Sequence, residues 1–204
     1  MTTTGWVLLA LGAALVWWAV ATYNRLVELR NRIANAFGQI DVQLKRRHDL
    51  VPNLVEVARA YLQHEAATLE AVIAARNQAQ GAAAAARAAP TNAGALGTLA
   101  SAEGLLGASL GRLMVVSEAY PELKADATMQ QLSEELASTE NRIGFARQAF
   151  NDQALDFNTA AQQFPALVVA RLAGFAEAPM LQSTRSEEER AAPRVQFPGA
   201  AAKP

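Results

Sequence analysis

Residues 5–22 read GWVLLALGAALVWWAVAT, a stretch of 18 residues without a charged side chain. As a helix this stretch is about 27 Å long, close to the ~30 Å hydrocarbon core of a bilayer. Trp6 lies near one end, and Trp17, Trp18 and Tyr23 lie near the other, as in the aromatic belts of membrane helices. We therefore predict that residues 1–23 form a transmembrane anchor.

A cleaved signal peptide is the alternative for this segment. Ala19-Val20-Ala21 has the small-x-small form of a cleavage site. However, no Lys or Arg precedes the apolar run, the run is longer than a usual signal core, and two tryptophans lie beside the site. We favour an uncleaved anchor, and cleavage stays open as the alternative.

The positive charges around the apolar run are asymmetric. No basic residue precedes the run, whereas Arg25, Arg30 and Arg32 follow it closely. Because basic residues concentrate on the cytoplasmic side of membrane helices, this asymmetry predicts the orientation of the single-pass protein. Its N-terminus would lie outside and its C-terminal domain in the cytoplasm.

The rest of the 204-residue chain is expected to be all-α. Apolar residues make up 51% of the sequence, many of them alanine, which favours helix over sheet. Apolar residues recur every three or four positions, as on one face of a helix, in four successive segments. These segments are residues 26–44, 50–80, 95–119 and 126–164.

Four amphipathic helices joined by short turns pack best as an antiparallel bundle. We predict an elongated four-helix bundle in residues 24–175, with helix four capped by Asp126 and ended by Pro165. A shorter apolar piece, residues 166–175, would close one end of the bundle. Residues 176–204 are polar, contain several prolines and lack periodicity, so we predict a disordered tail.

A cluster of polar residues separates the first two predicted helices: Lys45, Arg46, Arg47, His48 and Asp49. We interpret it as a turn, in which Asp49 caps the second helix and Pro52 occupies its first turn. The basic residues would then lie near the C-terminus of the first helix, where its dipole favours cations. Such a turn is a candidate surface for a protein partner or for lipid.

Few residues in the chain could perform catalysis or bind a metal. The chain has no cysteine and only two histidines. His64-Glu65 begins like a zinc-protease helix, but Thr68 stands where the second histidine would be. Three carboxylates of the fourth predicted helix lack the Glu-x-x-His motif of di-iron bundles; these are Glu134, Glu135 and Glu140. We expect no metal, no cofactor and no small-molecule substrate.

Nucleic acid is not an expected partner either, because the formal net charge is only −1. A pairing of His48 with Asp49 as base and orienting group remains the one enzymatic alternative. Neither a serine nearby in sequence nor any cysteine accompanies this pair. We therefore expect that the protein is not an enzyme.

Long blocks of the sequence resemble the bacterial LemA family. They are YNRLVELRNRIANAFGQIDVQLKRRHDLVPNLVE, HEAATLEAVIAARNQA, EAYPELKAD and TENRIGFARQAFNDQALDFN with QQFP. The resemblance runs from Tyr23 to about Phe175, and the tail resembles the family in PRVQF, residues 193–197. It implies an N-terminal membrane helix followed by a helical bundle, in a family without an established enzymatic activity, catalytic residue or cofactor.

Three hypotheses for function follow. The first is a non-enzymatic bundle anchored in the bacterial cytoplasmic membrane, which serves as a scaffold or adaptor for a membrane-protein partner or for self-assembly. The second is a protein that binds or remodels the membrane directly. The third is an enzyme centred on His48 and Asp49.

Overall fold

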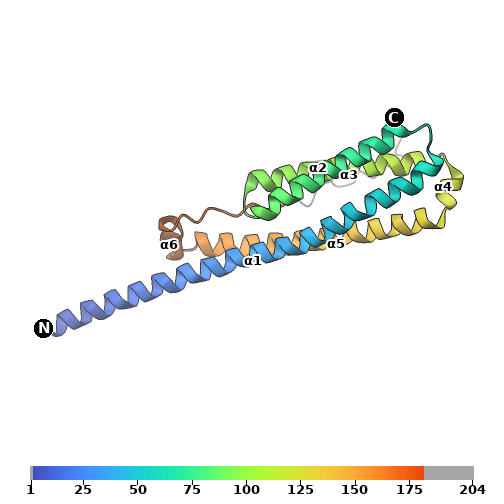
Figure 1. Ribbon diagram of the computed structural model, residues 1–204. Coiled ribbons are helices and arrows are strands. Elements are labelled where there is room, and N and C mark those ends of the chain that lie inside the picture. Colours follow the sequence, from blue (N-terminus) through green and yellow to red (C-terminus); the bar gives the residue numbers. More distant parts are fainter. Residues whose placement is uncertain (1, 182–204) are drawn as a thin grey trace, which may run out of the picture.

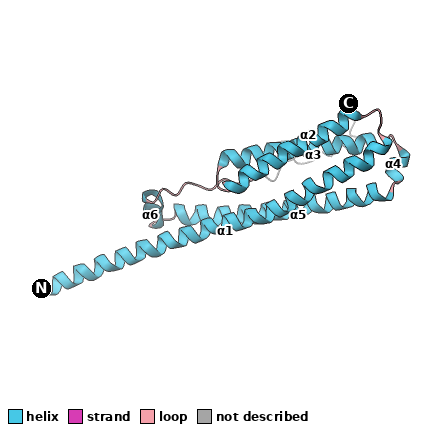
Figure 2. Cartoon of the chain, viewed as in Figure 1, coloured by secondary structure: helices cyan, strands magenta, loops and turns pink. Residues whose placement is uncertain are grey.

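The computed structural model describes residues 2–181, and these are helical with no strand (Figures 1 and 2). The helices are α1 (Thr3–Tyr61), α2 (Ala66–Ala88), α3 (Ala93–Ser117), α4 (Pro121–Ala125), α5 (Ala127–Gln162) and α6 (Ala166–Leu172). The expectation of an all-α chain is confirmed for these residues.

Helix α1 is one continuous helix of 59 residues, which corrects the predicted helix boundaries. The turn expected at residues 45–52 is wrong, because this segment is helical and Pro52 lies inside α1. Asp49 therefore caps no helix. The chain turns only at residues 62–65, between α1 and α2, and α2 extends to Ala88 beyond the expected end near residue 80.

Two pairs of long helices build the folded region of the molecule. Helix α1 packs along α5, α2 packs along α3, and α1 also contacts α2 (Figure 1). The buried positions of α1 follow steps of three and four residues, as knobs do in coiled-coil packing; they include Leu26, Leu29, Ile33, Phe37, Ile40, Leu44, Arg47, Val51, Leu54 and Ala58. The same spacing runs through Leu96, Leu99, Glu103, Leu106, Leu110 and Leu113 of α3.

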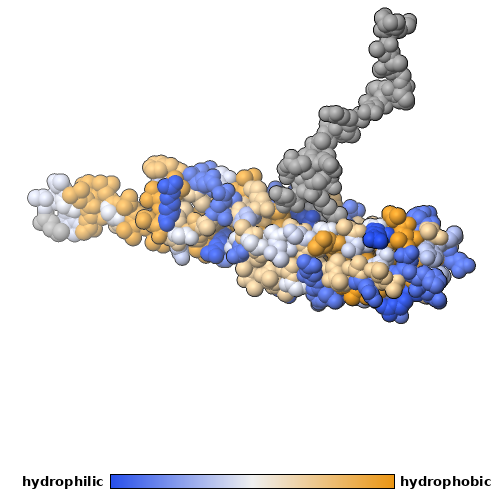
Figure 3. Space-filling view, turned by 90° about the horizontal axis from the view of Figure 1, so that it is seen from above, coloured by the Kyte–Doolittle hydropathy of each residue, from blue (hydrophilic) through white to orange (hydrophobic). Residues whose placement is uncertain are grey.

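The first third of α1 projects beyond the other helices (Figure 1). Its large apolar side chains from Trp6 to Tyr23 are exposed, except for the half-buried Trp18, and the first buried residue of α1 is Leu26. Figure 3 shows hydrophobic side chains along this projecting end. By length and composition the segment could cross a membrane. Helix α3 is also long and apolar enough to cross a membrane, but a third of its most apolar stretch is buried, as in the core helix of a folded domain.

The predicted start of the last long helix is confirmed. The carboxylate of Asp126 accepts a hydrogen bond of 2.9 Å from the backbone N–H of Met129, as an N-cap does. This bond is the main reason why the pKa of Asp126 is lowered, and the Tyr61 hydroxyl, which donates to the same carboxylate, lowers it further. Helix α5 then continues to Gln162, close to the predicted stop at Pro165.

The segment after α6 packs against α5, so the predicted disordered tail does not begin at residue 176. The side-chain amide of Asn158 donates to the carbonyl of Ala178 and accepts from its N–H, at 2.9 and 2.8 Å. Asn151 makes the same pair of bonds with Leu181, each at 2.8 Å. Both Ala178 and Leu181 are buried. The rest of the predicted tail, residues 182–204, lies outside the described residues.

Candidate functional site: a polar cluster in the last third of α1

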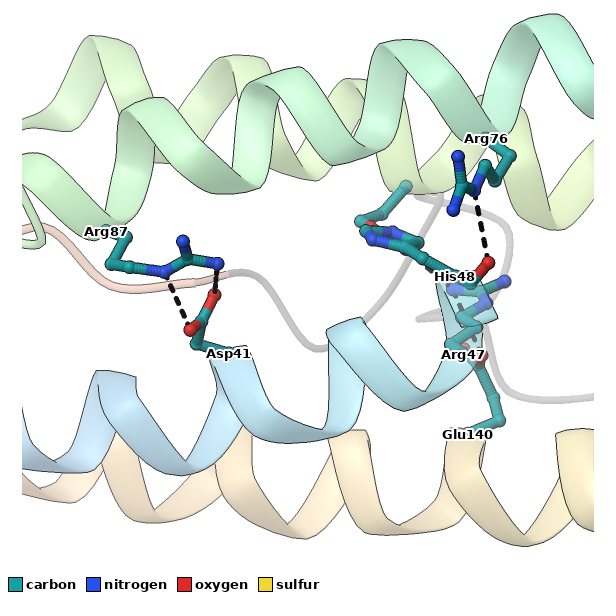
Figure 4. Close-up of polar contacts among 7 residues, drawn as sticks. Asp41, Arg47, His48, Arg76, Arg87 and Glu140 are labelled. Carbon is teal, nitrogen blue, oxygen red and sulfur yellow. Dashed lines mark hydrogen bonds and ion pairs between the residues drawn. The ribbon is translucent and has the colours of Figure 1, made fainter. Parts of the chain in front are cut away.

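Pro52 removes one hydrogen bond from the last third of α1. Because proline has no backbone N–H, the carbonyl four residues earlier, that of His48, has no donor within the helix. The Arg76 guanidinium of α2 supplies this donor, with its Nε 3.1 Å from the His48 oxygen. Figure 4 shows Arg76 reaching from α2 toward α1 at this point. A side chain of the neighbouring helix thus satisfies the polar group that Pro52 frees.

Arg47 lies one residue before this carbonyl and is the centre of a buried ion cluster. Its Nη1 is 2.9 Å from a carboxylate oxygen of Glu103 on α3 and 3.2 Å from one of Glu140 on α5. Only 2% of Arg47 and 2% of Glu103 is exposed, whereas the Glu140 side chain is half-buried. Arg47 and Glu103 both occupy positions that leucine fills elsewhere in the same stripes. The cluster therefore ties three helices together at one level.

His48 completes this cluster. Its Nε2 lies 2.7 Å from the second carboxylate oxygen of Glu103, and only 3% of the residue is exposed. An ionised carboxylate accepts hydrogen bonds but cannot donate them, so Nε2 carries the hydrogen. Glu103 thus accepts from Arg47 with one oxygen and from His48 with the other. The partner of this nitrogen is Glu103, not the neighbouring Asp49 that the catalytic alternative required.

A polar pocket of about 450 Å³ lies between α1 and α2, beside His48. It is lined by Asp41, Lys45, His48, Asp49, Gln80, Ala83 and Arg87. Arg87 closes one side by donating two hydrogen bonds, of 2.7 and 2.8 Å, to the carboxylate of Asp41 (Figure 4). These bonds raise the pKa of Arg87 further. Within residues 2–181 no group of three or more His, Asp or Glu residues is arranged to hold a metal.

The five residues of the predicted turn have different environments. Lys45, Arg46 and Asp49 are not buried on α1, and Arg46 lies 3.7 Å from Glu135 of α5. Arg47 and His48 are buried and face α3 and α5, so these two do not form an exposed basic surface.

Sequence reasoning missed Glu103 and Arg76, and found no role for Glu140. A signal for Glu103 was present, because it interrupts a leucine stripe as Arg47 does, with the opposite charge. The role of Arg76 could not be inferred, because its register against His48 depends on how α2 returns along α1.

The family comparison covers most of the helices just described. The model of the LemA family matches residues 36–197. The chain belongs to the LemA family. The match includes the polar cluster, α2, α3 and α5, and it begins after the projecting apolar segment of α1.

Among curated proteins, this LemA-family chain is similar to the magnetosome protein MamQ of Magnetospirillum gryphiswaldense, with 35% identity over 82 residues. It is also similar to MamQ 1 and MamQ 2 of Paramagnetospirillum magneticum, each 33% identical over 84 residues. The matches cover 40–41% of this chain and 30–31% of those proteins, so the chain spans under a third of these relatives. Family membership and the apolar start of α1 are consistent with association with a membrane.

Proposed function

We propose that this LemA-family protein is a membrane-anchored, non-enzymatic scaffold that presents a bundle of four long helices to a membrane-protein partner or to further copies of itself. The observation that carries the proposal is the continuity of α1. Its exposed apolar start is long enough to span a bilayer, and the same helix then contributes the buried stripe that packs on α5. A movement of the anchor is therefore transmitted directly to the bundle.

The polar cluster supports a scaffold function. A buried ion pair stabilises a fold little compared with well-packed apolar residues, but it can fix the register of packed helices. Arg47 meets carboxylates from α3 and α5 at one level, and Arg76 fixes α2 against α1 nearby. Arg47, His48 and Arg76 thus all have partners on neighbouring helices. We propose that they hold the helices in one register.

An exposed aromatic side chain on α5 is the candidate contact for the partner. Phe145 is 73% exposed and lies between Glu140, which contacts Arg47 of α1, and Phe150, which packs on Phe37. It is five residues from each, about 140° around the helix, so it lies on the face of α5 turned away from the α1–α5 seam. Isolated exposed apolar residues are common, but aromatic side chains are also enriched at interfaces.

Photo-crosslinking in cells tests the scaffold proposal. A photoreactive phenylalanine analogue at position 145 is expected to give a discrete adduct, either a dimer or a complex with another membrane protein. The same analogue in place of the exposed Gln78 on α2 is the matched control and is expected to give little adduct. Recovery of only uncrosslinked monomer from both positions would count against a scaffold.

Orientation and cleavage belong to the same proposal. We propose one span in the bacterial cytoplasmic membrane, with the N-terminus outside and the helical domain in the cytoplasm, because Arg25, Arg30 and Arg32 follow the apolar run. Reporter fusions at both ends test the orientation, and an external C-terminal reporter would reverse it. The intact mass of the membrane-extracted protein distinguishes an anchor from a signal peptide cleaved after Ala21.

The positions and contacts of residues 45–49 argue against the two alternative functions. Lipid binding through residues 45–47 is disfavoured, because Arg47 is buried and Lys45 lies about 33 Å along the helix from Tyr23. An enzyme centred on His48 and Asp49 is disfavoured by the bond between His48 and Glu103. Wild-type behaviour of a His48→Ala strain would dismiss the enzyme.

A further inference from the structure

An apolar surface lies on and beside α6, at the end of the molecule from which α1 projects (Figure 1). Phe164 and Leu172 are 84% and 85% exposed, and Val168, one helical turn before Leu172, is 50% exposed. These three residues define the α6 surface. Three large apolar side chains so strongly exposed within nine residues are unusual for a surface that faces only water.

The fold holds the α6 surface beside α1. Gly174, with φ of 72°, ends α6 in a Schellman motif, in which the Phe175 N–H donates to the Ala170 carbonyl and the Gly174 N–H donates to that of Arg171. The reversal brings the Phe175 ring to 5.6 Å from Tyr23 of α1 and 6.1 Å from Phe157 of α5. Helix α6 is thus fixed at the level of Tyr23.

Tyr23 marks the boundary between the apolar and the folded segments of α1. Residues 5–22 before it carry no charge, and Arg25 follows it two positions later. If the apolar run spans a bilayer, Tyr23 lies at the interface, where aromatic side chains concentrate. Helix α6 then lies at the same interface. Arg171 and Arg25 provide cations there, where anionic headgroups would attract them.

We propose that the α6 surface binds the bilayer: Phe164, Val168 and Leu172 insert at the boundary between headgroups and acyl chains, while Arg171 contacts anionic headgroups. The inference rests on the proposed membrane anchor and deepens it. The anchor and α6 then attach the bundle to the membrane at separate points, which fixes its tilt. The apolar faces of interfacial helices bind membranes in this way.

The absence of native cysteine allows clean fluorescent labelling at single positions of the full chain. We compare three variants, Trp17→Cys in the span, Leu172→Cys on α6 and Val115→Cys on α3, each labelled with the environment-sensitive fluorophore NBD. Val115 is the matched control, an apolar residue that is 73% exposed near α4, at the opposite end from α6. The proteins are reconstituted in vesicles of phosphatidylethanolamine and phosphatidylglycerol, with or without a nitroxide near the top of the acyl chains.

The expected result is loss of emission on nitroxide quenching at positions 17 and 172, with little loss at 115. Quenching at 17 but not at 172 would overturn the α6 inference and leave the anchor intact. Absence of quenching at 17 would refute the anchor, and with it the inference. Equal quenching at all three positions would also contradict it, because contact would not be specific to α6. Adding Phe164→Asp to the labelled Leu172→Cys protein should reduce quenching at 172 without changing its circular dichroism spectrum.

Discussion

The hydrogen bond from Arg76 to the His48 carbonyl predicts that the effects of mutating Pro52 and Arg76 on stability are coupled, although these two residues do not bond to each other. Arg76→Met keeps a long apolar stem but removes the donor, so the part-buried His48 carbonyl loses its partner. Leaving a buried acceptor unsatisfied costs about 1–3 kcal/mol. In a Pro52→Ala background the new backbone N–H at position 52 can bond this carbonyl, and the same Arg76→Met change should then cost little.

The coupling is measured on four proteins: wild type, Arg76→Met, Pro52→Ala and the double variant. Their thermal unfolding in detergent is followed by circular dichroism at 222 nm. For a chain of this size, 1 kcal/mol corresponds to a shift of about 2–4 °C in Tm. We expect a coupling free energy of about 1–2 kcal/mol between positions 52 and 76, within the range seen for interacting residues. Arg87→Met, which breaks the Arg87–Asp41 contact between α2 and α1, should have the same effect in both backgrounds. Equal costs of Arg76→Met with and without Pro52 would refute the reasoning.

Three further predictions concern other contacts. Glu103→Leu should destabilise the fold by about 3–5 kcal/mol, because it leaves Arg47 buried without its main partner. Adding Arg47→Leu to this variant should restore part of the lost stability in the same unfolding assay. Because the pKa of Asp126 is lowered in the folded state, its ionised form stabilises the fold above pH about 4, and this contribution is lost as the pH falls through the folded pKa. The difference in Tm between wild type and Asp126→Asn should therefore shrink between pH 5 and pH 2, whereas a constant difference would contradict the pKa. Asn158→Ala should abolish hydrogen-exchange protection of the Ala178 amide, which a matched Gln148→Ala variant at an exposed position of α5 should retain.

Most helix positions could be predicted from the sequence, because each long helix buries a stripe with clear periodicity. The N-cap at Asp126 and the extent of α3 within about two residues follow from local signals of this kind. The predicted break at residues 45–52 is wrong, because the local turn signals there are misleading and the buried stripe continues through them. Pro52 and a run of charges resemble a turn, yet the buried steps continue through Leu44, Arg47, Val51 and Leu54.

The polar cluster was harder to predict because its contacts join residues of different helices. A charged residue in an apolar stripe is informative only once a residue of opposite charge is found in a facing stripe, as Glu103 faces Arg47. The hydrogen bonds between Asn158 and Ala178 could not be predicted for a related reason. Residues 176–181 have no periodicity, and their order comes from side-chain amides that mimic a backbone partner.

The continuity of α1 across Tyr23 underlies both the scaffold and the second membrane attachment. It can be measured directly by double electron–electron resonance on the full chain in lipid vesicles, with spin labels at Val20→Cys and Val42→Cys, both exposed positions. A single helix predicts one narrow distance distribution centred near 33 Å, from 22 residues at about 1.5 Å each. A broad or clearly shorter distribution would show that the helix breaks at the membrane boundary, and would contradict a rigid link between anchor and bundle.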